Sequence, residues 1–174
     1  MSQDAQSADF ATLPFVDRHG FRTTVEPQQV WAALAPTLMS VFGKPRARTY
    51  ARLVGCRERR LSRPFLMEEG DTLAGFRIAS ARAPEELVLE GEHRFSRYAL
   101  VFQIGGRQGI TTVSAETRAE FPKVWGLVYR LLVVGTGIHA GIVRRLLKGL
   151  RRRAEWDRQP SRRKRTKAGT AGAR

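Results

Sequence analysis

The sequence predicts one α+β domain in which a curved antiparallel β-sheet grips a long C-terminal α-helix, with two short helices after the first strand. Three observations predict this fold class. Four consecutive segments in the middle of the chain alternate apolar and polar residues, as half-buried strands do. A helical periodicity then continues for about thirty residues. Between the first strand and these segments, apolar residues recur at helical spacing on both sides of Pro36.

Length and composition fit a single domain with a core of its own. The chain has 174 residues, of which 42% are hydrophobic. We divide it into a loose polar segment (1–14), the domain itself (15–153) and a basic disordered tail (154–174). The first residues are polar and acidic, without the basic region and apolar run of a secretory signal, so we expect a cytoplasmic protein.

The first strand is predicted from Phe15 to Val25, and Pro27 then begins a helix, since proline suits the first helical turn. Pro36 predicts a break in this helix, or a second short helix from Thr37 to Phe42, because proline removes a backbone donor. The apolar residues at helical spacing in this region are Val30, Trp31, Leu34 and Leu38.

Residues 44–70 have a weak pattern, which indicates a strand near Tyr50 to Val54 and a basic stretch from Arg57 to Arg63. This region contains Cys56, the only cysteine, which allows no internal disulfide. The neighbouring Arg57 would favour a reactive thiolate, but no base partner is evident in the sequence. We therefore interpret Cys56 as an inert core thiol.

A meander of antiparallel strands is predicted beyond Gly70. Segments rich in turn-forming residues separate its strands, and a proline or several glycines occur in two of the three. The predicted turns are Ala83 to Glu85, Phe95 to Ser96 and Gly105 to Gly109. The predicted strands are Leu73 to Ser80, Glu86 to His93, Arg97 to Ile104 and Ile110 to Phe121.

Alternation along these strands predicts a sheet with one apolar face and one charged face. The apolar face carries Phe76, Ile78, Leu87, Leu89, His93, Tyr98, Leu100, Phe102, Val113, Ala115 and Thr117. The charged face carries Arg77, Glu90, Glu92, Arg94, Glu116, Arg118 and Glu120.

A long amphipathic helix is predicted from Pro122 to near Arg153. Its apolar side carries Val128, Leu131, Leu132, Ile138, Ile142, Leu146 and Leu150. Small and basic residues form the opposite side: Gly126, Arg130, Gly137, Gly141, Arg144 and Lys148. We expect the apolar side to lie across the apolar face of the sheet and to leave a cavity between helix and sheet.

Two other interpretations of this segment are weaker. Gly135 and Gly137 match part of a dinucleotide-binding fingerprint, with Glu155 in the place of its acidic residue. That fold needs a second parallel strand, and the chain beyond Glu155 is a basic tail without one. The apolar run is also long enough for a membrane span, but an arginine in mid-span, here Arg130, costs about 2.5–3.5 kcal/mol.

Three segments resemble bacterial proteins of the SRPBCC superfamily, which includes START-like, polyketide cyclase/dehydrase and lipid transport proteins. They are Leu87 to Phe102, Ala115 to Pro122, and Gly135 to Gly141 with Arg144 and Arg145 beyond. The stretch from Val30 to Leu34 is also similar to the first helix of that superfamily. The resemblance covers residues 15–150 and implies a helix-grip fold with an apolar pocket, without specifying the ligand.

The leading hypothesis is therefore the binding or carriage of a small lipid-like or polyketide-like ligand in that cavity. An enzyme of the cyclase or dehydratase type is the alternative, with His93, Tyr98 and His139 as acid/base candidates. Both functions need the same apolar enclosure. The candidate pocket residues are Phe76, Leu89, His93, Tyr98, Phe102, Trp125, Tyr129 and His139.

No cofactor or metal site is predicted, because none of the three histidines has a partner at a metal-binding spacing. Charge indicates a third hypothesis. The net charge is +15, and ten Lys or Arg residues lie between Arg151 and Arg174, against Glu155 and Asp157. Residues 157–174 are thus a candidate contact for nucleic acid or anionic membrane, unless the tail only increases solubility.

Overall fold

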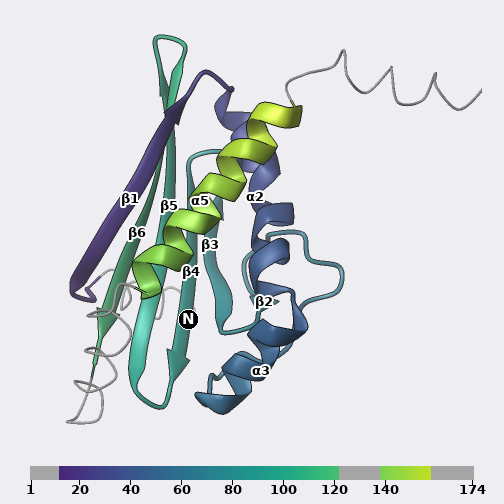
Figure 1. Ribbon diagram of the computed structural model, residues 1–174, viewed down its shortest axis with the longest axis vertical. Helices are drawn as coiled ribbons and strands as arrows, with labels where there is room; N and C mark the ends of the chain where they lie inside the picture. Colours follow the sequence, from purple (N-terminus) through teal and green to yellow (C-terminus); the bar gives the residue numbers. More distant parts are fainter. Residues whose placement is uncertain (1–11, 122–137, 158–174) are drawn as a thin grey trace, which may run out of the picture.

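The structure, a computed structural model, describes residues 12–121 and 138–157. A six-stranded antiparallel sheet, in the order β1-β6-β5-β4-β3-β2, forms one layer (Figure 1). Helices α2 and α5 lie across one face of this sheet, and α3 lies at the end near the β4–β5 turn (Figure 1). The strands are β1 (Phe15–Thr23), β2 (Thr72–Leu73), β3 (Phe76–Arg82), β4 (Glu86–His93), β5 (Ser96–Arg107) and β6 (Ile110–Glu120). The predicted fold class is confirmed.

β1 ends at Thr23 rather than at the predicted Val25, and β6 ends one residue early, at Glu120. Two other strands differ more from the sequence prediction, and backbone geometry at or near glycines explains both. The strand predicted from Leu73 to Ser80 is divided into β2 and β3 at Gly75, whose φ of +86° is outside the strand region. β5 continues beyond Ile104, because Gly105 and Gly106 still pair with β6. The turn is formed instead by Gln108 and Gly109, both with positive φ, as a tight hairpin turn requires.

Two helices follow β1, but they are divided at a different place from the prediction. Helix α2 (Pro27–Phe42) runs through Pro36 without a break, and α3 (Pro45–Leu53) follows it. Pro36 has no backbone N–H, so the carbonyl of Ala32 loses its helical hydrogen bond. Both residues are exposed, and water can take the place of the missing donor. The strand expected near Tyr50 to Val54 is wrong, since this stretch belongs to α3 and to the turn that ends it.

Helix α5 (Ile138–Asp157) is the described part of the predicted long helix, whose first half lies outside the described residues. It continues past the predicted Arg153 to Asp157, the last described residue. Its buried stripe consists of Val143, Leu146, Leu147, Leu150 and Ala154, and it packs against α2 and β1. Ile142 was expected on the apolar side and is instead 46% exposed. Among the described helices, none is long and apolar enough to cross a membrane.

The core lies between the sheet and helices α2 and α5. Strand positions predicted to be apolar are buried there, including Ile78, Leu87, Leu100, Val113 and Ala115. We call this the inner face of the sheet, and the opposite face the outer face. The predicted division of the sheet into an apolar and a charged face is confirmed for these residues.

Candidate functional site

The inner face becomes more polar toward the end of the sheet beside α3. Six side chains with polar atoms lie on this part of it. One is Ser96, which pairs with His93 and donates its hydroxyl to the carbonyl oxygen of Arg97. We call the other five the inner polar band: Asp17 and His19 on β1, Thr117 on β6, Tyr98 on β5 and His93 on β4. Asp17 pairs with Thr117, and Thr117 in turn pairs with Leu100. Strand spacing then separates the Cα atoms of Asp17 and Tyr98 by roughly 12 Å.

Asp17 and His19 form one end of the inner polar band. They are two residues apart on β1 and therefore point to the same face, toward the interior. Nε2 of His19 lies 3.3 Å from Oδ2 of Asp17, within the range of an ion pair. This contact lacks the geometry of a hydrogen bond, and within the described chain Nε2 of His19 and Oδ1 of Asp17 are buried without a hydrogen-bond partner.

Tyr98 on β5 lies two strands from Asp17 and is fixed by its hydroxyl group. The hydroxyl donates a hydrogen bond to the carbonyl oxygen of Gly75 at 2.6 Å and lies 3.8 Å from Sγ of Cys56. The ring lies over Gly91 on the neighbouring strand, where any side chain would collide with it. Tyr98 thus holds the β2–β3 connection against the sheet, which is a structural role.

His93 packs beside Tyr98, with ring centroids 5.4 Å apart. Its Nδ1 accepts a hydrogen bond from the backbone N–H of Phe95 at 3.1 Å. Burial lowers the pKa of His93 below its usual value, so the neutral imidazole is favoured. Phe76 contacts the Tyr98 ring edge-on at 5.2 Å, and Phe42 of α2 contacts Phe76 at 4.9 Å. These rings form an aromatic wall at this end of the inner face.

Of the candidate pocket residues, the structure brings Phe76, His93 and Tyr98 together. Leu89 and Phe102 are completely buried in the core, where they contribute to packing. The remaining candidates were Trp125, Tyr129 and His139. The two aromatic residues lie outside the described residues, and His139 lies in α5 with a side chain that is not described.

The sequence prediction missed Asp17 and His19 as candidates. The signal that could have found them is two titratable residues at alternate positions of a predicted strand, where one face must be buried. The interpretation of Cys56 as an inert thiol is supported, since it is 2% exposed and burial raises the pKa of its thiol.

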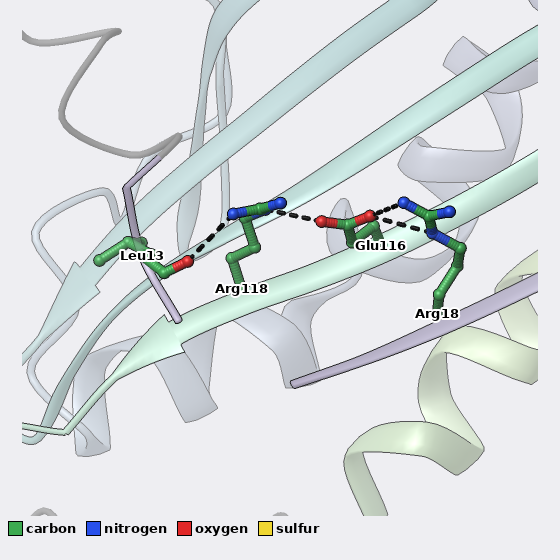
Figure 2. A network of polar contacts seen from close by, with 4 residues as sticks. All are labelled: Leu13, Arg18, Glu116 and Arg118. Atoms are coloured by element: carbon green, nitrogen blue, oxygen red, sulfur yellow. Dashed lines mark hydrogen bonds and ion pairs between the residues drawn. The ribbon is translucent and has the colours of Figure 1, made fainter. Parts of the chain in front are cut away.

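The outer face carries a network centred on Glu116 (Figure 2). Arg18 and Arg118 each donate to this carboxylate through Nε, at 2.9 and 2.6 Å, and Arg118 also donates to the carbonyl of Leu13 at 3.2 Å. Burial opposes the charged form of Glu116, but the two arginines outweigh it and lower the pKa of the carboxyl. The network therefore connects β1, β6 and the segment before β1.

An open depression of about 380 Å³ lies beside this network, with Val88, Ala99 and Val101 among its lining residues. The charges at its rim are already paired with one another, as in Arg18–Glu116 and Arg82–Glu86. A further buried atom without a partner in the described chain, Oε2 of Glu90, lies on this face, and burial raises the pKa of that carboxyl. No ligand chemistry is evident in this depression.

The described residues, 12–121 and 138–157, contain no group of three or more His, Cys, Asp or Glu side chains that could hold a metal ion. The inner polar band offers a different chemistry. It places one carboxylate, two imidazoles and two hydroxyl groups beside apolar residues such as Leu89 and Leu100. Such a face can bind the polar groups of a molecule whose body is apolar.

No family model matches the chain, and no curated protein matches it. Solved structures with a similar chain trace include a protein from Rhodobacter sphaeroides, 18% identical over 79% of this chain and 90% of that one, with a TM-score of 0.47. A protein from Thermus thermophilus is 17% identical over 83% and 99%, with a TM-score of 0.44. CalU16 from Micromonospora echinospora is 13% identical over 79% and 82%, with a TM-score of 0.37. These similarities carry no information about function.

Proposed function

We propose that this domain binds a small molecule with an apolar body and at least one polar group along the inner face of the sheet. The polar group contacts Asp17 and His19, and the apolar body extends toward the aromatic wall of Phe76, His93 and Tyr98. The observation that supports this most is the pair of buried polar atoms on Asp17 and His19 that find no hydrogen-bond partner within the described chain.

The energetics favour a ligand over a packing role for these two residues. A buried polar atom without a hydrogen bond costs about 1–3 kcal/mol, which an apolar residue at the same position would avoid. Both Asp17 and His19 therefore lower the stability of the isolated domain. A hydroxyl or carbonyl group of a ligand would supply the missing partner, because Oδ1 accepts a hydrogen bond and Nε2 can donate or accept one.

The distance across the inner polar band limits the size of the ligand. Roughly 12 Å separates the Cα atoms of Asp17 and Tyr98, and Leu100 and Thr117, which lie between them on the inner face, are both buried. A fused-ring polyketide-like molecule or a lipid-like chain matches this length. A small polar metabolite does not, because it is too short to reach from Asp17 to the aromatic wall.

The first test is native mass spectrometry of the protein purified from its source organism, followed by denaturation to release any bound molecule. We expect an adduct with an apolar body and one or more oxygen atoms. The same protein would then be titrated with phenylnaphthylamine, a neutral fluorescent probe of apolar sites. If neither an adduct nor saturable probe binding is found, the proposal is wrong.

A second test separates the polar group from general packing. His19→Leu removes one of the atoms without a partner, so we expect unchanged or higher stability, by up to about 1 kcal/mol, together with a loss of adduct. Arg22→Gln is the matched control on the same strand, since Arg22 is exposed and alternates onto the outer face. Equal adduct occupancy in both variants would contradict a role for His19.

A second candidate function is proton transfer on the bound molecule. The observation that favours it is the 3.3 Å contact of Asp17 with His19, because a carboxylate beside an imidazole can orient it as a general base. The identified ligand or its precursor would be incubated with the protein and analysed for a product. If the wild type converts the ligand and His19→Gln binds it without converting it, the protein is an enzyme. If the wild type leaves the ligand unchanged, the protein is a carrier.

A further inference from the structure

The outward side of α3 carries exposed apolar residues where a surface helix is normally polar. Ala51 is buried and faces the domain. On the opposite side, Arg46, Thr49, Tyr50 and Leu53 follow each other at the spacing i, i+3, i+4, i+7, which places them on one stripe. Leu53 is 81% exposed and Tyr50 is 52% exposed. We call this stripe, together with the adjacent Arg52, the α3 surface.

Positive charge surrounds these exposed apolar side chains. Residues 44–63 contain eight Lys or Arg residues and one acidic residue, Glu58. Lys44, Arg46 and Arg52 are exposed on or next to α3. Arg57 follows α3 and is also exposed, although its guanidinium lies 3.9 Å from the carboxylate of Glu92. The α3 surface thus combines a strongly basic field with two projecting apolar side chains, and it matches a partner that is both anionic and apolar just beneath its surface.

The α3 surface also lies close to the inner polar band. Ala51 packs with Cys56 and Ala74 in a small cluster of its own, and Cys56 contacts the hydroxyl of Tyr98. Gly55, just after α3, lies beside Arg94 in the β4–β5 turn. α3 therefore lies beside the Tyr98 part of the inner polar band, near the β4–β5 turn.

We propose that the α3 surface docks the protein on a membrane that contains anionic lipid. The basic residues contact the lipid headgroups, and Leu53 and Tyr50 enter the boundary between headgroups and acyl chains. The exposed Leu53 favours a lipid surface over nucleic acid as the partner. Single-stranded nucleic acids stack on aromatic rings and gain little from an aliphatic side chain. This docking does not depend on the function proposed above.

Vesicle co-sedimentation with the full chain tests the proposal. The vesicles contain phosphatidylcholine alone or phosphatidylcholine with phosphatidylglycerol, and the wild type is expected to bind only the second kind. Arg46→Gln/Arg52→Gln should weaken binding roughly tenfold to thirtyfold, because it removes two basic contacts. Leu53→Ser should weaken it about fivefold or more, because it removes an inserted apolar side chain without changing the charge.

The matched control is Arg144→Gln/Lys148→Gln, which removes the same charge from the exposed side of α5. We expect this control to bind within about twofold of the wild type. Equal weakening by both double variants, or no effect of Leu53→Ser, would overturn the proposal in favour of attraction by net charge. Loss of binding to a single-stranded RNA oligonucleotide in the α3 variants, with vesicle binding intact, would assign the surface to nucleic acid and also overturn it.

Discussion

The ring of Tyr98 lies over Gly91, and this close contact depends on the absence of a side chain. A Cβ atom at residue 91 would lie 2.5 Å from Cε2 of Tyr98 and even nearer to the carbonyl oxygen of Gly75. The second of these atoms belongs to the backbone and has little freedom to move. Gly91 therefore determines how closely β4 approaches the β2–β3 connection and Tyr98.

We predict that Gly91→Ala lowers the free energy of unfolding by about 2–3 kcal/mol, because the added methyl group overpacks this contact. Gly105→Ala on β5 is the control, since nothing lies within 4 Å of the position of its Cβ. This control should remain within about 0.5 kcal/mol of the wild type. Urea denaturation of the two variants measures both values, and equal stability would refute the close packing at Gly91.

His93 gives a prediction on pH. Burial lowers the pKa of His93 in the folded protein, so the unfolded chain binds its proton first as the pH falls below the ordinary value of 6.5. Protonation of His93 has no effect on the free energy of unfolding above that pH, and it lowers this free energy below it. The drop in unfolding free energy between about pH 7.5 and about pH 5.5 should thus be smaller in His93→Gln than in the wild type. An equal drop in both would contradict the assignment.

Individual site residues were predictable only where the strand pattern was clear. The alternation of β4 and β5 placed His93 and Tyr98 on the same face, and the structure brings them together. The sequence did not indicate that the Tyr98 hydroxyl binds Gly75 or that Cys56 lies beside it, because those contacts join the irregular region 44–70 to the sheet. Contacts of this kind depend on tertiary geometry, which local patterns do not contain.

Among the elements, the helices after β1 were the hardest to predict. Pro36 is a strong signal for a break, yet α2 continues because its unpaired carbonyl faces water. Helix α3 was missed for a different reason. Its exposed side carries Tyr50 and Leu53, so the helical pattern of buried and polar residues is obscured at those positions. The apolar and basic residues of α3 do largely separate onto two sides, but its large apolar residues lie on the side that faces away from the domain.

Helix α5 supplies a prediction at the level of the element. Gly149 lies inside this helix, where glycine is about 0.5–1 kcal/mol less favourable than alanine. An added Cβ would meet only Cγ2 of Thr37 in α2, at 3.9 Å, which is an ordinary contact. We expect Gly149→Ala to raise the unfolding free energy by about that amount. Thermal denaturation measures the change. Lower stability of the variant would contradict the prediction and would mean that α2 and α5 leave no room for the added methyl group.

At the scale of the whole molecule, the sequence predicted the sheet well because its strands form a meander. Each of β2 to β5 pairs with the next strand along the chain, so local alternation and turn residues determine both the pairing and the faces. Only β1, among the described strands, pairs with a strand distant in the sequence. The chemical identity of the proposed ligand could not be predicted in the same way, since an apolar face with a few polar groups suits many ligands.

The basic segment that follows Asp157 supplies a prediction for the whole chain. Residues 158–174 contain seven Lys or Arg residues and no acidic one. We propose that this segment binds phosphate groups, so that its deletion weakens binding to a single-stranded RNA oligonucleotide and reduces the dependence on salt. Removal of one phosphate-binding residue should lower the logarithmic salt slope by about 0.7. Fluorescence anisotropy at several salt concentrations gives both quantities, and unchanged slopes would show that the segment serves only solubility.

The pairing of β1 with β6 has a consequence for synthesis on the ribosome. Phe15 of β1 pairs with Arg118 of β6. β1, which is synthesised first, can therefore pair only after β6, which is synthesised last, has left the ribosome. Until then β3, β4 and β5 can pair with their neighbours along the chain, but β1 lacks β6 and α2 lacks α5, the helix against which it packs most extensively. A nascent chain arrested before β6 thus leaves much of the apolar inner face exposed, and it is the form for which a chaperone would be needed.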